Sequence, residues 1–328
     1  MKKLGKILLV CLGILLVLLV VAINFTIGWR PFIGPKKRAL TTRQFERTPE
    51  RLERGRYLMQ SVLGCGTCHS PRDWSQHGAP VLPGMELAGQ PLPLPGFPGN
   101  IVAPNLTPDN TTGSWTDDQI ARAIRQGIKH DDSTLIPLMP YEAYKALSDE
   151  DLASVIVFLR SVTPVRNPLP VSQINFPVNY LVRGAPDPVI APVHGPDPSD
   201  VLAHGKYMVT VGCGCHKAVN PKLGYGGGEV LKGPWGEATS ANITPDASGI
   251  SYCNEATFIT TLRTGYVGAR KLNSIIPFRE FKDLTDDDLK IIFAYLRTVE
   301  PIKHRVDNSL PPTYCKLCKN THGAGDQN

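Results

Sequence analysis

The sequence predicts an all-α protein in which an N-terminal transmembrane helix precedes two tandem domains of the same kind. Three observations support this prediction. A long apolar run begins at residue 7, no strand-like alternation of polar and apolar residues persists, and three short motifs recur later in the chain at one fixed offset. A length of 328 residues suits two domains, each of about 100 residues, with connecting segments.

The apolar run covers residues 7–23 and is preceded by Lys2, Lys3 and Lys6. Together with the apolar residues that follow it as far as Trp29, the run can span a bilayer. A cleaved signal peptide is the alternative, but no small-residue cleavage site closes the run. Basic residues flank both ends, so charge alone does not set the orientation. We expect an uncleaved anchor over residues 1–30, followed by a juxtamembrane segment over 31–47.

The most specific motif is Cys65-Gly66-Thr67-Cys68-His69, which has the C-x-x-C-H spacing of a c-type haem attachment site. Two thiols at this spacing bond the two vinyl groups of one porphyrin, and the following histidine binds the iron as its proximal ligand. We therefore predict that Cys65 and Cys68 attach one haem c and that His69 ligates its iron. The alternative is a disulfide beside a solvated histidine, which the adjacent histidine disfavours.

A methionine is the most common second axial ligand of a haem that carries electrons. The chain has five methionines, of which Met139 lies in a loop between Pro137 and Pro140. These prolines exclude a regular helix and favour a stiff, extended loop that holds the thioether at a fixed point. We predict Met139 as the second ligand of the first iron. A gap-filling core methionine is the alternative, and Met59 and Met85 are weaker candidates for the ligand.

These motifs, with Ala103-Pro104-Asn105-Leu106-Thr107-Pro108 and Leu147-Ser148-Asp149-Glu150-Asp151-Leu152, resemble a class I cytochrome c domain. The resemblance covers about residues 48–166. It is strongest to the multi-haem cytochrome c subunits of membrane-bound bacterial dehydrogenases.

The resemblance implies two structural features of this domain. Its first and last helices should cross near a glycine and an aromatic residue, which here are Gly55 or Tyr57 and Phe158. A backbone carbonyl, that of Pro104, should bind the far ring nitrogen of His69 and fix the orientation of the imidazole.

An internal repeat predicts a second domain of the same kind. The repeated segments are offset by 137 positions and pair residues 105–109 with 242–246, 147–152 with 284–289, and 159–162 with 296–299. Upstream, Gly55-Arg56-Tyr57 matches Gly205-Lys206-Tyr207. The predicted organisation is therefore a cytochrome c domain over 48–166, a Pro-rich linker over 167–198, a cytochrome c-like domain over 199–305, and a Cys-containing tail over 306–328.

The second domain has a degenerate haem motif. Its sequence, Gly212-Cys213-Gly214-Cys215-His216, has one residue between the cysteines where two are needed. When the motif is aligned on Cys215 and His216, Gly212 occupies the position of the first cysteine. Two interpretations remain open: the domain has lost its haem, or it holds a second haem by one thioether through Cys215, with His216 beneath the iron and Cys213 as the alternative attachment residue.

The repeat also places other residues of the second domain. Ile276 stands where Met139 stands in the first domain, and Ala241 stands in the place of Pro104. A distal thioether is therefore missing. We expect the remaining histidines to be solvated, and His304, which follows the last predicted helix, is the least improbable stand-in among them for a distal ligand.

The tail contains Cys315-Lys316-Leu317-Cys318, which raises three alternatives. A disulfide is favoured, because unpaired thiols are unusual in an oxidising compartment. A zinc site from Cys315, Cys318 and His322 is second, since its fourth ligand is not obvious, although a cysteine at 213 or 215 could supply one. Haem attachment is last, because only ten residues follow Cys318.

The predicted function is electron transfer by a membrane-anchored c-type cytochrome. His–Met ligation fills both axial positions of the first haem and leaves no site for a substrate. The expected role is to carry single electrons between a dehydrogenase or quinol-oxidising complex and a terminal acceptor of the respiratory chain. Because haem c is attached outside the cytoplasm, we expect the body on the periplasmic face of a bacterial cytoplasmic membrane.

Two alternative functions remain open. One is a di-haem peroxidase-like enzyme with an open second haem, and the other is a mono-haem carrier whose second domain is a docking module. Much of the net charge of +6 lies near the anchor, and no basic helix is present in the sequence, so nucleic acid is not an expected partner. No nucleophile triad or phosphate-binding loop is discernible, which favours a carrier over an enzyme.

Overall fold

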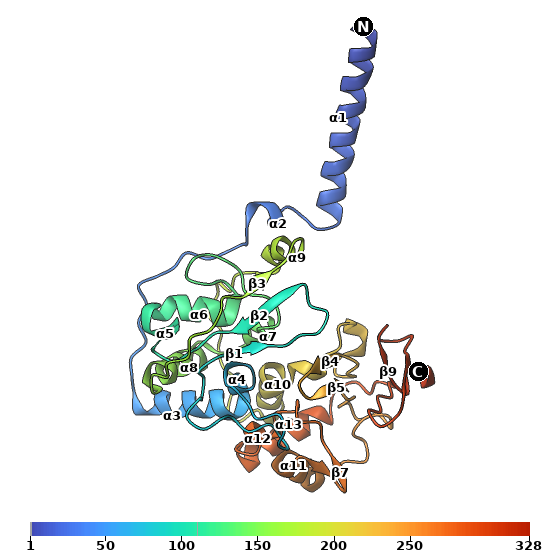
Figure 1. The fold of residues 1–328 in the computed structure, drawn as a ribbon. Coiled ribbons are helices and arrows are strands. Elements are labelled where there is room, and N and C mark those ends of the chain that lie inside the picture. The colour runs from blue at the N-terminus through green and yellow to red at the C-terminus, as the bar shows by residue number, and fades with distance from the viewer. Residues whose placement is uncertain (1, 110) are drawn as a thin grey trace.

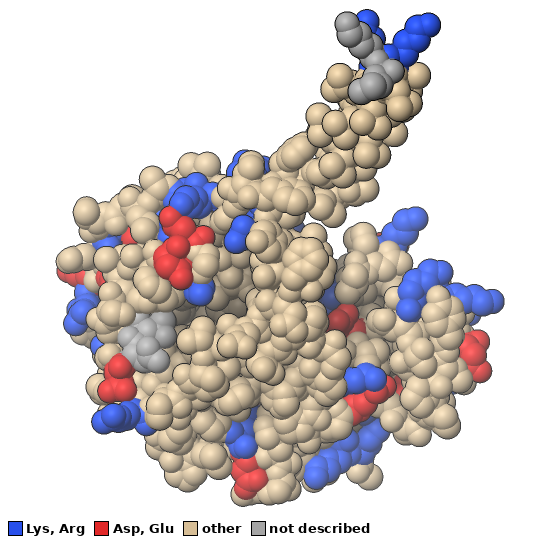
Figure 2. All heavy atoms as spheres, turned by 45° about the horizontal axis from the view of Figure 1, so that its top comes forward, with Lys and Arg blue, Asp and Glu red and all other residues tan. Residues whose placement is uncertain are grey.

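Helix α1 (Lys2–Phe25) projects from the body of the chain in the computed structural model, which describes residues 2–109 and 111–328 (Figure 1). Its segment Lys3–Phe25 has a mean hydropathy of 3.2 and none of it is buried against the body. Figure 2 shows basic side chains at the tip of α1 and none along its length. By length and composition this helix can cross a membrane, although a signal sequence would meet the same criteria.

The first helical unit contains both the predicted haem motif and the predicted methionine loop. Its elements are α3 (Pro49–Tyr57), the π-helical turn η1 (Leu58–Val62), α4 (Cys65–His69), α5 (Thr111–Ser114), α6 (Asp117–Gln126), α7 (Tyr141–Tyr144) and α8 (Asp149–Ser161). Thr48, Thr116 and Ser148 begin α3, α6 and α8 by accepting hydrogen bonds from backbone N–H groups. The helices thus start where the capping residues of the sequence place them.

Helices α3 and α8 cross at a glycine, as the resemblance implies. A Cβ atom added to Gly55 would lie 1.9 Å from the carbonyl oxygen of Ser154 and 2.8 Å from Cβ of Phe158. Only a residue without a side chain permits this close approach. The crossing is therefore confirmed, with Gly55 rather than Tyr57 at the contact.

The second helical unit repeats this arrangement. Its elements are α10 (Val201–Gly212), the short turns η3 (Gly214–His216) and η4 (Pro221–Leu223), α11 (Glu255–Thr264), α12 (Phe278–Phe281) and α13 (Asp286–Leu296). A Cβ atom on Gly205 of α10 would lie 2.4 Å from the carbonyl oxygen of Ile291 and 2.7 Å from Cβ of Tyr295. Helices α10 and α13 therefore cross as α3 and α8 do.

Short antiparallel strands connect the helices. Strands β1 (Gln90–Leu92), β2 (Gly99–Ala103) and β3 (Gln173–Ile174) form one sheet in that order. The other strands pair as hairpins: β4 (Val230–Gly233) with β5 (Gly236–Thr239), β6 (Tyr266–Val267) with β7 (Arg270–Lys271), and β8 (Pro312–Tyr314) with β9 (Thr321–Gly323).

The all-α prediction is therefore too narrow, because the chain is 40% helical and 10% strand. The strands are two to five residues long, as in β3 and β2. A period of two residues does not become visible over so short a length.

The two helical units share one core. Leu58 and Ile156 of the first unit and Met208, Leu289 and Ile292 of the second belong to a single cluster of buried side chains. Burial of apolar area on this scale is the main force that holds the two helix pairs together.

Reciprocal hydrogen bonds join the same two pairs of helices. The hydroxyl of Tyr57 donates to Asp288 of α13, and the hydroxyl of Tyr207 donates to Asp151 of α8 at 2.6 Å. Each hydroxyl also accepts a hydrogen bond from the backbone N–H of the residue that caps the helix it contacts. The distance is 3.1 Å for the Tyr57 hydroxyl and 3.2 Å for the Tyr207 hydroxyl. Contacts exchanged in this way are typical of a two-fold arrangement.

The segment predicted as a Pro-rich linker lies along the first helical unit. It contains α9 (Val178–Leu181) and η2 (Val182–Gly184), which pack against α2 (Arg30–Ile33) close to the end of α1 (Figure 1). Large apolar side chains are exposed on this part of the surface: Phe32, Ile33, Phe176, Tyr180 and Leu181. The chain ends in the turn η5 (Gly325–Gln327).

Candidate haem sites

The histidine of the C-x-x-C-H motif is held by the backbone carbonyl that the resemblance implies. Nδ1 of His69 lies 2.8 Å from the carbonyl oxygen of Pro104. A carbonyl oxygen can only accept, so Nδ1 carries the proton and Nε2 keeps a free lone pair. Burial lowers the pKa of His69, while the bond to Pro104 opposes this shift. The imidazole is therefore neutral, which is the form that ligates iron.

The motif opens onto a large cavity. The cavity has a volume of about 3000 Å³ and is lined by Cys65, Cys68, His69 and Met139. A pocket for one small molecule is usually about 300–1,000 Å³, so this space can hold more than one group of haem size. The methionine loop is fixed by a hydrogen bond of 2.7 Å from the backbone N–H of Tyr141 to the carbonyl oxygen of Met139.

The other methionines are placed differently. Met59 also lines the cavity but is 2% exposed and belongs to the shared core, which suits a packing role. Met85 is not among the described residues that line the cavity. Met139 is thus the methionine outside the core helices that borders the same space as His69.

The degenerate motif brings its histidine to the same kind of site. Nδ1 of His216 lies 2.8 Å from the carbonyl oxygen of Ala241, which the repeat aligns with Pro104. Burial lowers the pKa of His216, and this backbone bond again opposes the shift. A second contact is repeated as well. The backbone N–H of Gly227 donates to His216 O at 3.1 Å, as that of Gly89 donates to His69 O at 2.7 Å.

The histidine reaches this position although the chain leading to it is shorter. Nine positions separate Tyr207 from His216, against twelve between Tyr57 and His69. In the first unit the π-helical turn η1 and the helix α4 lie in this longer segment. In the second, α10 stays regular and the short turn η3 completes the path. The shortening of the second unit therefore lies in the segment that precedes the histidine.

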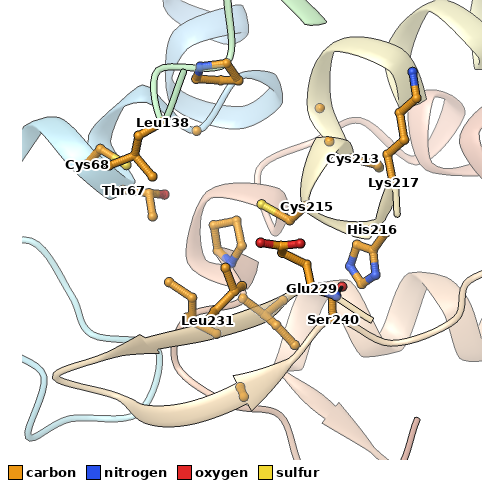
Figure 3. A pocket seen from close by; sticks show the side chains of 18 of the residues that line it. Thr67, Cys68, Leu138, Cys213, Cys215, His216, Lys217, Glu229, Leu231 and Ser240 are labelled. Carbon is orange, nitrogen blue, oxygen red and sulfur yellow. Dashed lines mark hydrogen bonds between the residues drawn. The ribbon is translucent and has the colours of Figure 1, made fainter. Parts of the chain in front are cut away.

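Cys215 and Cys213 both line the cavity, but they are oriented differently. Figure 3 shows the Cys215 side chain pointing into the space beside Glu229, across from Thr67 and Cys68 of the first motif. Cys213 follows the end of α10 and packs partly against the shared core. Of the two thiols, Cys215 is the better placed to attach a group in the cavity.

The two motifs thus face one cavity. Burial raises the pKa of the Cys68 thiol to about 11, and the charge of a Cys215 thiolate contributes to this rise. The sulfur of Cys215 is therefore near enough to affect the Cys68 thiol electrostatically.

The comparisons with known proteins agree with this geometry. The family model described as cytochrome c matches residues 52–163. This segment of the chain is a cytochrome c domain. The chain is 31% identical over 278 residues to the gluconate 2-dehydrogenase cytochrome c subunit of Pantoea cypripedii, covering 76% of this chain and 59% of the relative. It is 30% identical over 265 residues to the fructose dehydrogenase cytochrome subunit of Gluconobacter japonicus, covering 76% and 52%.

A third relative is a diheme cytochrome c-type protein of Cereibacter sphaeroides. It is 26% identical over 256 residues, covering 73% of this chain and 83% of the relative. The chain spans about half the length of the first two relatives. The resemblance to cytochrome c subunits of dehydrogenases is confirmed, and the cytochrome c domain supports haem c as the cofactor.

The second unit has no methionine at the position of the repeat that corresponds to Met139. Ile276 lines the cavity at that position of the repeat. His304, the predicted stand-in ligand, is not among the described residues that line the cavity, and its Nε2 lies 3.5 Å from Sγ of Cys315 instead. The prediction for His304 is therefore wrong, because the turn after α13 directs this side chain to the tail.

Glu229 is a residue of the second site that the sequence did not reveal. It precedes β4, and its carboxylate contributes to the raised pKa of Cys215, which is caused mainly by burial. An acidic residue in a loop is ordinary, and no motif marks this one. Its position in the cavity becomes visible only when the loop before β4 folds beneath Cys215 (Figure 3).

Proposed function

We propose that this cytochrome binds two haem c groups in one shared cavity and carries single electrons for a dehydrogenase or quinol-oxidising complex. The observation that carries the proposal is the matched pair of histidines. His69 and His216 each bind a backbone carbonyl through Nδ1, at 2.8 Å in both cases, and each borders the same space. On this proposal residues 48–166 and 199–305 are two cytochrome c domains.

The residues of the first site fit one haem c group. Cys65 and Cys68 would attach the porphyrin, and His69 and Met139 would ligate the iron. When bound, haem supplies a one-electron iron couple, and a thioether ligand raises its potential. The protein holds the imidazole in one orientation and surrounds the site with apolar side chains, which limits contact with water.

The second site fits haem c held by a single thioether. Cys215 is the attachment residue, Cys213 is the alternative, and His216 is the proximal ligand. The orientation of the Cys215 side chain and the retained bond from His216 to Ala241 support this assignment. Ile276 offers no thioether at the position that corresponds to Met139, and a thioether ligand raises the potential of a haem iron. Haem groups bound at the two sites would therefore differ in potential.

We further propose that α1 remains as an anchor and that the body rests on the outer face of the membrane. The exposed apolar side chains of α2 and α9 lie next to the end of α1, where they would meet the lipid interface. The relatives include cytochrome subunits of dehydrogenases. The proposed partner is therefore a membrane-bound dehydrogenase, with a respiratory protein as the terminal acceptor.

The intact mass of the full chain, purified from membranes in detergent, tests the haem assignment. We expect the mass of the complete polypeptide with two haem groups. Cys215→Ala should lose one haem, whereas the matched control Cys213→Ala should retain both. Loss of a haem from Cys213→Ala and not from Cys215→Ala would reverse the attachment assignment.

The same measurement separates the alternatives. A wild-type chain with one haem would contradict the proposal and favour a mono-haem carrier with a docking domain. A mass lacking the N-terminal residues would show that α1 is a cleaved signal. Turnover of hydrogen peroxide by the two-haem protein would instead favour the peroxidase-like enzyme.

A further inference from the structure

A second cluster of ligand-type side chains lies away from the haem cavity. His304, Cys315, Cys318 and His322 each offer one ligand atom, and the four atoms lie within 4.8 Å of one another. His304 follows α13, the two cysteines form the turn after β8, and His322 lies on β9. Two parts of the chain thus converge on one point.

Three of the four residues are buried and Cys318 is half-buried, and hydrogen bonds orient the two histidines as ligands. Exposure is 0% for His304 and Cys315 and 1% for His322. Nδ1 of His304 donates to the carbonyl oxygen of Gly226 at 2.7 Å, and Nδ1 of His322 donates to that of Gly323 at 2.9 Å. In both rings Nε2 is therefore the deprotonated nitrogen. Metal-binding histidines are typically oriented by such bonds.

One of these nitrogens has no partner. Nε2 of His322 is buried without a hydrogen bond in the described part of the chain. A buried polar atom without a partner is uncommon and indicates a missing interaction. Nε2 of His304 lies 3.5 Å from Sγ of Cys315. For zinc bonds of about 2.3 Å to sulfur and about 2.0–2.1 Å to nitrogen, a tetrahedral site places these two atoms about 3.5 Å apart.

The backbone of the tail forms a tight turn around the cluster. The backbone N–H of Lys319 donates to Cys315 O at 3.0 Å, and that of Cys315 donates to Asn320 O at 2.8 Å. Lys319 has a φ of 64°, in the left-handed region. The side chain of Asn320 donates to Gly228 O at 2.7 Å. The turn thus holds both thiols towards the two imidazoles.

We propose that His304, Cys315, Cys318 and His322 bind one structural zinc ion. A set of two thiolates and two imidazoles matches the ligands and the four-coordinate geometry of structural zinc sites. The two thiols lose their protons on binding, since thiolates are the ligands. The sequence favours a disulfide here, but both cysteines are free thiols in the structure. The fourth ligand, which the sequence alone does not identify, is His304. The four ligands have the spacing H-x₁₀-C-x₂-C-x₃-H.

The internal repeat explains how this ligand arises. At the repeat offset, His304 corresponds to Asn167. Asn167 donates from Nδ2 to the carbonyl oxygens of Ala88 and Gly89, at 2.9 and 3.0 Å. His304 makes the corresponding bond to Gly226 with Nδ1, and its second nitrogen remains free to bind a metal. The substitution retains the contact with the loop and adds a ligand.

The zinc content of the full chain, purified in detergent and dialysed, tests the proposal. We expect one zinc ion per chain by elemental mass spectrometry. Cys318→Ser and His322→Ala should each lower the content at least tenfold. Cys253→Ser, which removes a free thiol outside the cluster, should leave the zinc content unchanged.

A chelator provides a second readout that does not depend on how a variant folds. Removal of zinc from the wild type should expose two thiols to alkylation, and one equivalent of Zn²⁺ should protect them again. A Cys315–Cys318 disulfide in zinc-free native protein would overturn the proposal, as would unchanged zinc in Cys318→Ser and His322→Ala. Neither result depends on the number of haem groups.

Discussion

Tyr207→Phe tests the reciprocal hydrogen bonds between the two helix pairs. The hydroxyl of Tyr207 donates to the carboxylate of Asp151 at 2.6 Å, and Tyr207 is 9% exposed. A hydrogen bond to a charged group contributes about 1.5–3 kcal/mol. Asp151 keeps its paired bonds from Arg54, at 2.8 and 2.9 Å, so its charge stays compensated. We therefore expect the free energy of unfolding to fall by about 1.5–2 kcal/mol, near the lower end of this range.

Urea unfolding followed by far-UV circular dichroism measures this loss. With an m-value of about 2–3 kcal/mol/M, the midpoint should fall by about 0.5–1 M. Tyr252→Phe is the matched control, because this tyrosine is 61% exposed and surface changes usually stay within about 0.5 kcal/mol. If Tyr207→Phe unfolds at the same midpoint as Tyr252→Phe, the bond between α8 and α10 does not stabilise the fold.

The pH dependence of unfolding provides a second test of the same contacts. Burial raises the pKa of Tyr57 to about 12, with a contribution from Asp288, and burial likewise raises the pKa of Tyr207. The folded chain keeps both phenol protons at a pH where the unfolded chain has lost them. This stabilisation is complete below about pH 10 and is lost as the pH rises through the raised values. The double variant Tyr57→Phe/Tyr207→Phe should show a smaller loss of stability above pH 10, and an unchanged profile would contradict this account.

Two further predictions concern the first site and the helix crossings. Met139→Ala should keep its covalent haem but lose the weak near-infrared band of sulfur–iron ligation and have a lower potential, and persistence of the band would exclude Met139 as ligand. Gly55→Ala should destabilise the fold by about 2 kcal/mol in urea unfolding, since the clash with a backbone carbonyl outweighs the better helix propensity of alanine. Gly195→Ala, whose added Cβ would lie 3.6 Å from Ser148 in ordinary contact, is its control, and equal stability of the two would refute the argument from close approach.

The features that the sequence predicts well depend on local chemistry. Attachment of haem requires a fixed spacing of thiols and histidine, so the motif at Cys65–His69 is visible without a fold. The carbonyl of Pro104 and the crossing at Gly55 follow from the resemblance, and both are confirmed by the structure. Helix starts such as Ser148 are visible because a capping side chain must directly precede the helix.

The features that the sequence does not reveal depend on contacts between distant segments. Tyr57 and Asp288 are 231 positions apart, and neither residue type marks a contact by itself. Glu229 enters the cavity only through the path of its loop. The sequence places His304 at the wrong site, because its position after α13 does not reveal the tail that packs against it.

The loop at Gly226–Gly228 connects the two proposed sites of the second unit. The carbonyl oxygen of Gly226 binds Nδ1 of His304, and the backbone N–H of Gly227 binds the carbonyl oxygen of His216. The position of the proximal histidine is thus supported by the same loop that orients a proposed zinc ligand. A haem held by one thioether has fewer covalent constraints than one held by two, so the position of His216 depends more on this loop. Removal of zinc should therefore alter the absorbance of the second haem and leave that of the first unchanged. An equal effect on both, or on neither, would show that the tail does not support His216.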